Sequence, residues 1–194
     1  MAPDEGQVTF DGQPVAGLAP HRLARLGIAR KLQTPGIWPG LDVVDHLAVP
    51  LFAAAGRRGL LGLFSRPRHA EAAELMELTG LQARAHRPAG GLAHGDKQWL
   101  EIAMLLALRP KLLLLDEPTA GMTPAETRRT ATLVRRICDE AGISAIVIEH
   151  DLAFVREIRS PVAVMSRGRV IRRGSYDEIA ADPAVRTLYL GRRA

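Results

Sequence analysis

A run of four leucines at residues 112–115, ending in the acidic pair Asp116-Glu117, constrains the fold more than any other feature. A short, unbroken apolar run after Pro110 is typical of a strand that is buried on both faces. A second run, at residues 143–148, is rich in β-branched apolar residues and follows after one helix-like stretch. Buried strands that alternate with helices predict an α/β protein with a mostly parallel sheet and helices on both sides of it.

Capping and turn signals predict the other elements. Thr123-Pro124-Ala125-Glu126 combines a capping box with proline at the first helical position, and Gly142 ends that helix. Ser175 and Glu178 form a second capping box, which opens the final helix. The remaining predictions are a hairpin around Asp11-Gly12, a helix over 20–26, a helix over 151–158, a strand over 162–165 and its antiparallel partner over 169–172.

The length of 194 residues is that of one domain. Between residues 43 and 109 the pattern is mainly helical, with interruptions at 56–67 and 88–95. We therefore predict a helical subdomain over 43–109 within a single domain over 1–194. Residues 110–194 form the core α/β portion.

Composition excludes several classes of protein. The net charge is +5 and the pI is about 10.1, but the arginines are scattered in ones and twos beside acidic residues and aromatic residues are scarce, so nucleic acid is not an expected partner. The N-terminus has no secretory signal, and no apolar run is long enough for a membrane span. The single cysteine, Cys138, excludes a disulfide framework and suits helix packing. These features indicate a cytoplasmic protein.

The acidic pair lies where α/β proteins bind ligands, at the carboxyl end of a buried strand. Adjacent side chains at a strand end point to different sides, so Asp116 and Glu117 are expected to do different work. One carboxylate suits Mg²⁺, and the other suits the activation of water. A plain alternative is that the pair only caps the following helix. His150, which follows the next strand, is expected at the same sheet edge, where an imidazole could contact a phosphate or polarise a water.

Two loops upstream could complete such a site. Gly90-Gly91-Leu92-Ala93-His94-Gly95 leads into a helix predicted to begin near Asp96, and backbone N–H groups at a helix N-terminus favour anions. Gln33 lies where regular structure gives way to a loop, and its side-chain oxygen could complete a metal shell.

In this order and spacing, the motifs resemble those of the ATPase subunit of ABC transporters. Gln33 matches the Q-loop of that family, Asp116 and Glu117 end its Walker B motif, Ala120-Gly121-Met122-Thr123 matches its D-loop, and His150 matches its H-loop. The signature loop corresponds to Leu92, Ala93, His94, Gly95 and Asp96. The stretches 27–35 and 97–102 and the ending Tyr189-Leu190-Gly191-Arg192 resemble the branched-chain amino-acid subgroup, and within it the urea-transporter ATPases most closely.

This sequence departs from the family in two motifs. Walker A requires Gly-x-x-x-x-Gly-Lys, and none of the three lysines (Lys31, Lys97, Lys111) follows a glycine. We therefore expect the chain to begin beyond the P-loop, so that the P-loop and the first strands of a P-loop NTPase-like fold are missing. Ala93 replaces the usual signature serine and Asp96 the usual glutamine, which removes one phosphate hydrogen bond and adds negative charge. Each change is expected to weaken the contact with nucleotide by about 1–3 kcal/mol.

The resemblance implies an ATP-hydrolysing subunit of an importer for urea or branched-chain amino acids. It assigns Asp116 and Gln33 to Mg²⁺, Glu117 to the activation of water and His150 to the γ-phosphate, with ATP and Mg²⁺ as cofactors. The signature loop, Leu92 to Asp96, would contact nucleotide on a second ATP-binding subunit. Transmembrane permease subunits would be further partners, with the chain peripheral on the inner face of the cell membrane.

Three alternatives remain beside the catalytic subunit. The first is a non-catalytic partner that docks on a full ATPase subunit and offers its altered signature loop. The second is a truncated product without function. The third, a DNA-repair ATPase of the same superfamily, is disfavoured because Gly95 follows Gln33 by only 62 positions, which is too few for a long coiled coil.

Overall fold

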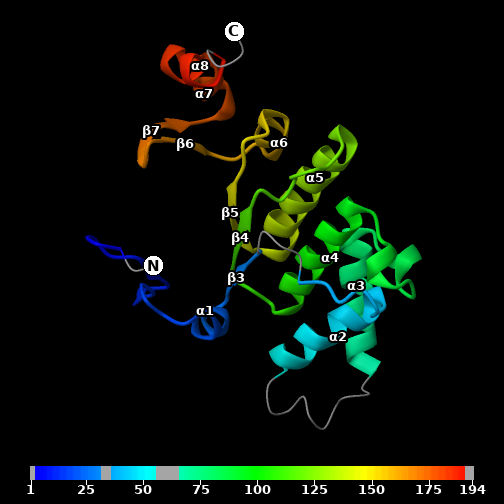
Figure 1. Cartoon of the computed structure of the whole chain (residues 1–194). Coiled ribbons are helices and arrows are strands. Elements are labelled where there is room, and N and C mark those ends of the chain that lie inside the picture. Colours follow the sequence, from blue (N-terminus) through cyan, green and yellow to red (C-terminus); the bar gives the residue numbers. More distant parts are fainter. Residues whose placement is uncertain (1–2, 32–35, 56–65, 191–194) are drawn as a thin grey trace.

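The centre of the molecule is a parallel three-stranded sheet. The computed structural model describes residues 3–31, 36–55 and 66–190. The sheet has the order β3-β4-β5, formed by β3 (Ile28–Arg30), β4 (Leu112–Asp116) and β5 (Ser144–Ile148), as Figure 1 shows. Leu112 lies opposite both Ile28 and Ser144. The predicted α/β class with a parallel sheet is confirmed.

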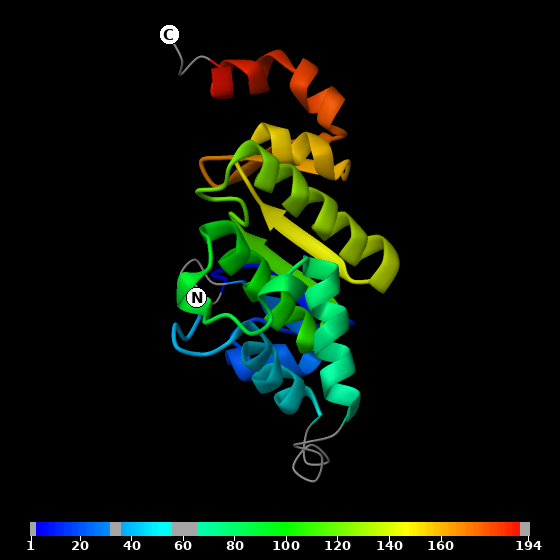
Figure 2. The same cartoon turned by 90° about the vertical axis from the view of Figure 1, so that its right-hand side faces the viewer.

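Helices α4 (His94–Ala107) and α5 (Pro124–Ala141) lie on the same side of this sheet (Figure 1, Figure 2). Alternate strand residues point to opposite faces, so one face carries the buried Leu113 and Leu115. The other face carries Ile146 and Ile148, whose exposed fractions are 56% and 61%. The second face, on which we also expected helices, is thus open at β5 within the described ranges.

The stretch before α4 is helical, as the sequence predicted. It consists of α2 (Val43–Ala54), α3 (Arg66–Thr79) and two 3₁₀ turns, Gln82–Arg84 and Ala89–Gly91. These helices pack on α4 and share one hydrophobic core with the sheet. The largest fully buried apolar side chains of this core include Leu47, Leu81, Leu100, Ile102, Leu113, Leu115, Ile137 and Phe154.

The C-terminal elements form a separate small core. After α6 (Leu152–Ile158), strand β6 (Val162–Ser166) pairs antiparallel with β7 (Arg169–Gly174), and α7 (Tyr176–Ala181) and α8 (Pro183–Leu190) follow. Val164, Ile179 and Val185 are its buried centre. The predicted third strand therefore exists, but it does not join the parallel sheet within the described residues. It pairs instead with the strand that follows it, because the tight Arg167-Gly168 turn brings the two together.

The N-terminal part begins with the predicted hairpin, β1 (Thr9–Phe10) and β2 (Gln13–Pro14), and continues with α1 (Pro20–Leu26). Asp11 and Gly12 both have positive φ, at 47° and 73°, as a two-residue hairpin turn of this type requires. No helix in the described ranges has both the length and the apolarity needed to cross a bilayer.

Candidate functional site

The two carboxylates of the predicted pair lie at the carboxyl edge of the sheet. Asp116 is the last residue of β4, and Glu117 begins the turn that follows. The Glu117 N–H donates to the carbonyl of Ile148, at the end of β5, over 2.9 Å. Glu117 has φ +46°, a left-handed conformation that costs energy for a residue with a side chain. The hydrogen bond to β5 helps to hold this strained residue at the strand end.

The structure brings His150 to the same edge. Its Nδ1 lies 3.4 Å from Oε1 of Glu117, and both side chains remain open to solvent, at 73% and 47% exposed. Sequence reasoning placed His150 here because parallel strands end at one edge. The described structure therefore contains an imidazole and a carboxylate that face each other across the ends of β4 and β5.

A buried glutamate that sequence reasoning missed holds these two strand ends together. The Glu149 side chain is only 2% exposed, and its carboxylate accepts hydrogen bonds from the backbone N–H of Thr119 at 3.0 Å and of His150 at 3.0 Å. It also accepts from the Thr119 hydroxyl. Glu149 thus ties the turn that carries Glu117 to the turn that carries His150. The available signal was an acidic residue directly between the apolar run of β5 and His150, but its burial could not be read from the sequence.

The signature loop opens helix α4 two residues earlier than predicted, at His94. Ala93 is the N-cap and supplies no side-chain hydrogen bond, as expected for a residue without a hydroxyl. Leu92 is buried at 7% exposure, in the main core. Its side chain therefore packs internally, and its place among the expected nucleotide contacts remains a prediction.

The negative charge of Asp96 is compensated inside the chain. Asp96 is buried, and its Oδ2 lies 2.7 Å from Nε of Arg84, which belongs to the first 3₁₀ turn. We expected this carboxylate to add charge beside a bound anion. In the structure it instead joins the N-terminus of α4 to the preceding turn, because a buried carboxylate requires a charged partner.

His94 and Gly95 lie against the turn between β4 and α5. The Nε2 atom of His94 is 2.9 Å from the carbonyl oxygen of Ala120, which accepts a hydrogen bond from the Nε2–H tautomer. A side-chain carbon on Gly95 would lie 2.5 Å from Oε1 of Glu126, so a larger residue there would displace the Glu126 side chain. The hydrogen bonds from Thr123 lower the pKa of Glu126 below its usual value. The signature and D-loop stretches are thus in direct contact within one chain.

Gln33 falls outside the described residues, but residues on both sides of it contact α4. Lys31 and Glu101 are buried, with Nζ of Lys31 3.7 Å from Oε2 of Glu101. Oε1 of Glu101 accepts a hydrogen bond from the N–H of Gly36 at 3.1 Å. Burial raises the pKa of the Glu101 carboxyl, although the Lys31 charge and the Gly36 N–H act in the opposite direction. Glu101 therefore joins α4 to the chain before and after Gln33.

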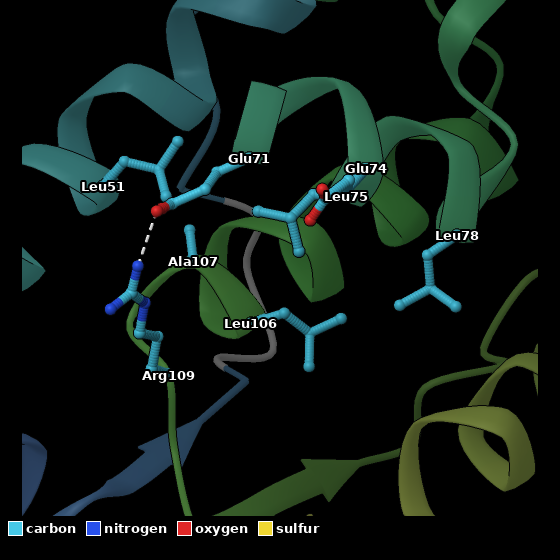
Figure 3. Close-up of a pocket in the computed structure, with 8 residues that line it drawn as sticks. All are labelled: Leu51, Glu71, Glu74, Leu75, Leu78, Leu106, Ala107 and Arg109. Carbon is cyan, nitrogen blue, oxygen red and sulfur yellow. Dashed lines mark hydrogen bonds and ion pairs between the residues drawn. The ribbon is translucent and has the colours of Figure 1, made fainter. Parts of the chain in front are cut away.

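A cavity of about 390 Å³ lies away from this edge, among the helices (Figure 3). Leu51 of α2, Leu75 of α3 and Leu106 of α4 contribute to its apolar wall. Arg109 and Glu71 form an ion pair of 2.6 Å beside it. The cavity contains neither of the carboxylates at the sheet edge.

The residues at the edge fit a magnesium ion held jointly with a phosphate ligand. Mg²⁺ usually takes one or two protein carboxylates and fills its shell with water and phosphate oxygens. Asp116 and Glu117 are adjacent and accessible, with side chains 22% and 47% exposed. No group of three or more acidic, histidine or cysteine side chains suited to a metal occurs in the described part of the chain. An all-protein metal cage is therefore not the arrangement seen there.

Comparison with known proteins identifies the family. The family model described as ABC transporter matches residues 1–120. The chain is 34% identical, over 197 aligned positions, to the high-affinity branched-chain amino acid transport ATP-binding protein BraF of Pseudomonas aeruginosa. That alignment covers 97% of this chain and 77% of BraF. The chain belongs to the ABC transporter family.

Solved cassettes of this family share the fold. The ADP conformation of MJ1267, an ATP-binding cassette of an ABC transporter, superposes with a TM-score of 0.83 at 26% identity, over 98% of this chain and 79% of the other. CbiO1 from Clostridium perfringens, part of the ABC transporter complex cbiONQ, gives a TM-score of 0.79 at 28% identity, over 99% and 76%. The described elements of this ABC cassette therefore have the arrangement of ATP-binding cassettes.

Proposed function

We propose that this chain is a nucleotide-binding, ATP-hydrolysing subunit of an ABC importer. The observation that carries the proposal is the meeting of Asp116, Glu117 and His150 at one sheet edge, with His150 Nδ1 3.4 Å from Glu117 Oε1. Phosphoryl transfer to water needs little covalent help from a protein, because positioning and electrostatic stabilisation do most of the work. A carboxylate pair beside an imidazole at an open edge suits that chemistry.

Each side chain has a distinct role in the proposed mechanism. Asp116 and Gln33 would hold Mg²⁺, and the ion would neutralise charge on the phosphates of ATP. Glu117 orients the attacking water and accepts its proton. His150 contacts the terminal phosphate and holds the Glu117 carboxylate. Glu149 fixes the spacing of Glu117 and His150 through its backbone hydrogen bonds.

The signature loop is proposed to serve a second ATP-binding subunit. Ala93, His94 and Gly95 lie at the N-terminus of α4, where helix N–H groups favour an anion. Leu92 and Asp96 support the loop from inside, through the core and the Arg84 ion pair. We assign residues 43–109 to a helical unit that faces permease subunits on the cytoplasmic side of the membrane, with its cavity (Figure 3) on that unit. Residues 110–194 would supply the core of the cassette.

The substrate is proposed to be a branched-chain amino acid or urea. The identity to BraF supports the first, and the resemblance of residues 27–35 and 97–102 to urea-transporter ATPases supports the second. Reconstitution with the cognate permease in vesicles decides between them: uptake of labelled leucine or of labelled urea should depend on ATP. Uptake of neither would overturn the assignment of substrate without touching the assignment of ATP hydrolysis.

A non-catalytic partner is the second candidate, because no lysine in these 194 residues follows a glycine as Walker A requires. The deciding experiment compares Mg²⁺-dependent ATP turnover of the full chain with that of Glu117→Gln. The ATPase proposal expects turnover that falls at least about 100-fold in the variant, since it loses the base. Equal rates in both proteins, or none in either, favour the partner that docks on a complete ATPase subunit.

A further inference from the structure

Arg30 contacts the proposed metal ligand from the neighbouring strand. It is the last residue of β3, opposite Leu114 in the parallel register with β4. Asp116 lies two positions beyond Leu114 and therefore on the same face of the sheet. Nη2 of Arg30 is 3.6 Å from Oδ2 of Asp116. The register of the two strands places a guanidinium beside this carboxylate.

The next residue along the chain, Lys31, cannot contact the Asp116 carboxylate in the same way. Successive residues at a strand end point to opposite faces, and Lys31 lies in the core, where it pairs with Glu101. The side chain of Arg30 is 62% exposed, whereas that of Lys31 is 2% exposed. Of the described arginine, lysine and histidine side chains, Arg30 and His150 are those within 4 Å of the two edge carboxylates. Arg30 contacts Asp116, and His150 contacts Glu117.

The ion pair of Arg30 and Asp116 can be replaced by contacts with other ligands. Exposed ion pairs contribute little to stability, so a stronger ligand can separate them without disturbing the fold. Guanidinium binds phosphate through two parallel hydrogen bonds, which makes arginine a good partner for an anion that arrives with a metal. A divalent ion and a guanidinium repel each other at one carboxylate. When a phosphate lies between them, both are attracted to it, and this attraction outweighs their mutual repulsion.

We propose that Arg30 is a phosphate-binding residue. Its guanidinium pairs with the Asp116 carboxylate until Mg²⁺ displaces it from that carboxylate. The proposal rests on the assignment of Asp116 to Mg²⁺. Without an anion, Arg30 competes with the metal for the carboxylate. With a polyphosphate present, the metal takes Asp116 and Arg30 turns to the phosphate oxygens. The same side chain therefore opposes metal binding alone and favours the binding of metal with phosphate.

The test uses the full chain and two titrations by calorimetry, one with Mg²⁺ alone and one with inorganic tripolyphosphate in the presence of Mg²⁺. Arg30→Gln should tighten binding of Mg²⁺ alone by about two- to fivefold, the range of an exposed ion pair. It should weaken binding of tripolyphosphate about tenfold or more, the value of a charge-assisted contact. Arg30→Lys should lie between the wild type and Arg30→Gln in both titrations.

Arg169→Gln is the matched control, because it removes the same charge from β7. It should change neither affinity appreciably, and thermal unfolding of every variant should match the wild type. The inference is overturned if Arg30→Gln changes both affinities in the same direction or behaves like Arg169→Gln. If Asp116→Asn abolishes the binding of Mg²⁺ but Arg30→Gln leaves it unchanged, the competition between Arg30 and Mg²⁺ is refuted. The assignment of Asp116 to Mg²⁺ then still stands. A wild type that binds neither probe refutes the proposed function as well.

Discussion

At the scale of single residues, the core contains the buried carboxylate of Glu101. Its pKa is raised because burial disfavours the charged form more than Lys31 and Gly36 favour it. The 3.7 Å separation from Nζ of Lys31 is an ion pair beyond hydrogen-bond distance. Its position on α4, in contact with the chain on both sides of Gln33, suits a positioning role more than a stabilising one.

Removal of the lysine should therefore be more harmful than removal of the carboxylate. Lys31→Met should lower the free energy of unfolding by about 3 kcal/mol at pH 7, because it leaves a buried charge without its partner. Glu101→Gln, which keeps an oxygen for the Gly36 N–H, should cost less, and adding it to Lys31→Met should recover much of the loss. Urea denaturation measures all three. Additive losses in the double variant would contradict the pairing, and Glu140→Gln, in an exposed helical ion pair, is the control.

The raised pKa of Glu101 also predicts a pH dependence. The folded chain holds the Glu101 proton to a higher pH than the unfolded chain does. Stability from this group is thus complete at and below the ordinary glutamate value of 4.5 and is lost as the pH rises through the raised pKa. In urea denaturation from pH 4 to 8, the wild type should lose stability relative to Glu101→Gln over that window. A difference between them that stays constant with pH would show that Glu101 titrates normally.

At the scale of elements, the contact of α4 with the start of α5 is the most informative. Thr123 and Glu126 form the capping box that opens α5, with the Thr123 N–H donating to Glu126 Oε2 over 2.8 Å. The same Glu126 side chain closes the space beside Gly95. Trp99 continues the contact one turn later, where its indole N–H donates to the Thr130 hydroxyl over 2.9 Å. Glu126 thus both caps α5 and packs against Gly95 of the signature loop.

Gly95→Ala should lower the free energy of unfolding by about 1–2 kcal/mol, since its methyl group displaces Glu126 and breaks the capping box. Glu126→Ala should cost about 1 kcal/mol through the same cap. The double variant should lose clearly less than the sum, because the two changes destroy one interaction. Chemical denaturation of the four proteins gives the coupling energy. Strict additivity would mean that the Gly95 methyl is accommodated elsewhere.

Local signals predicted the elements well and the long-range partners poorly. The two capping boxes at Thr123 and Ser175 open α5 and α7, because they depend only on neighbouring residues, but the helix at Ser175 is not the final one, since α7 ends at Ala181 and α8 follows. Strand β3 was not predicted as such, since its three residues become a strand only by pairing with β4, more than 80 positions away. The ion pair of Asp96 with Arg84 was missed for the same reason. The edge position of Asp116 followed from the leucine run alone, whereas its contact with Arg30 needed the register.

At the scale of the whole molecule, the parallel sheet has an unprotected side. Within the described residues no strand pairs with the outer edge of β5, and β6 pairs with β7 instead. Ile146 and Ile148 expose more than half of their surface on the face opposite Leu113 and Leu115. An edge strand with free backbone groups and apolar side chains is a template for association with another chain. The described fold therefore predicts self-association through β5.

Ile146→Thr with Ile148→Thr tests this expectation, because threonine keeps the β-branched shape of the strand while it removes apolar surface. Wild-type chain should show a sedimentation coefficient that rises with concentration, and the double variant should remain monomeric over the same range. Val49→Thr is the control, since Val49 is similarly exposed, at 52%, but lies on α2. Equal association of the wild type and the double variant would place the contact elsewhere on the surface. A monomeric wild type would show that this edge does not recruit a second copy, even though its backbone groups lack a partner strand in the described fold.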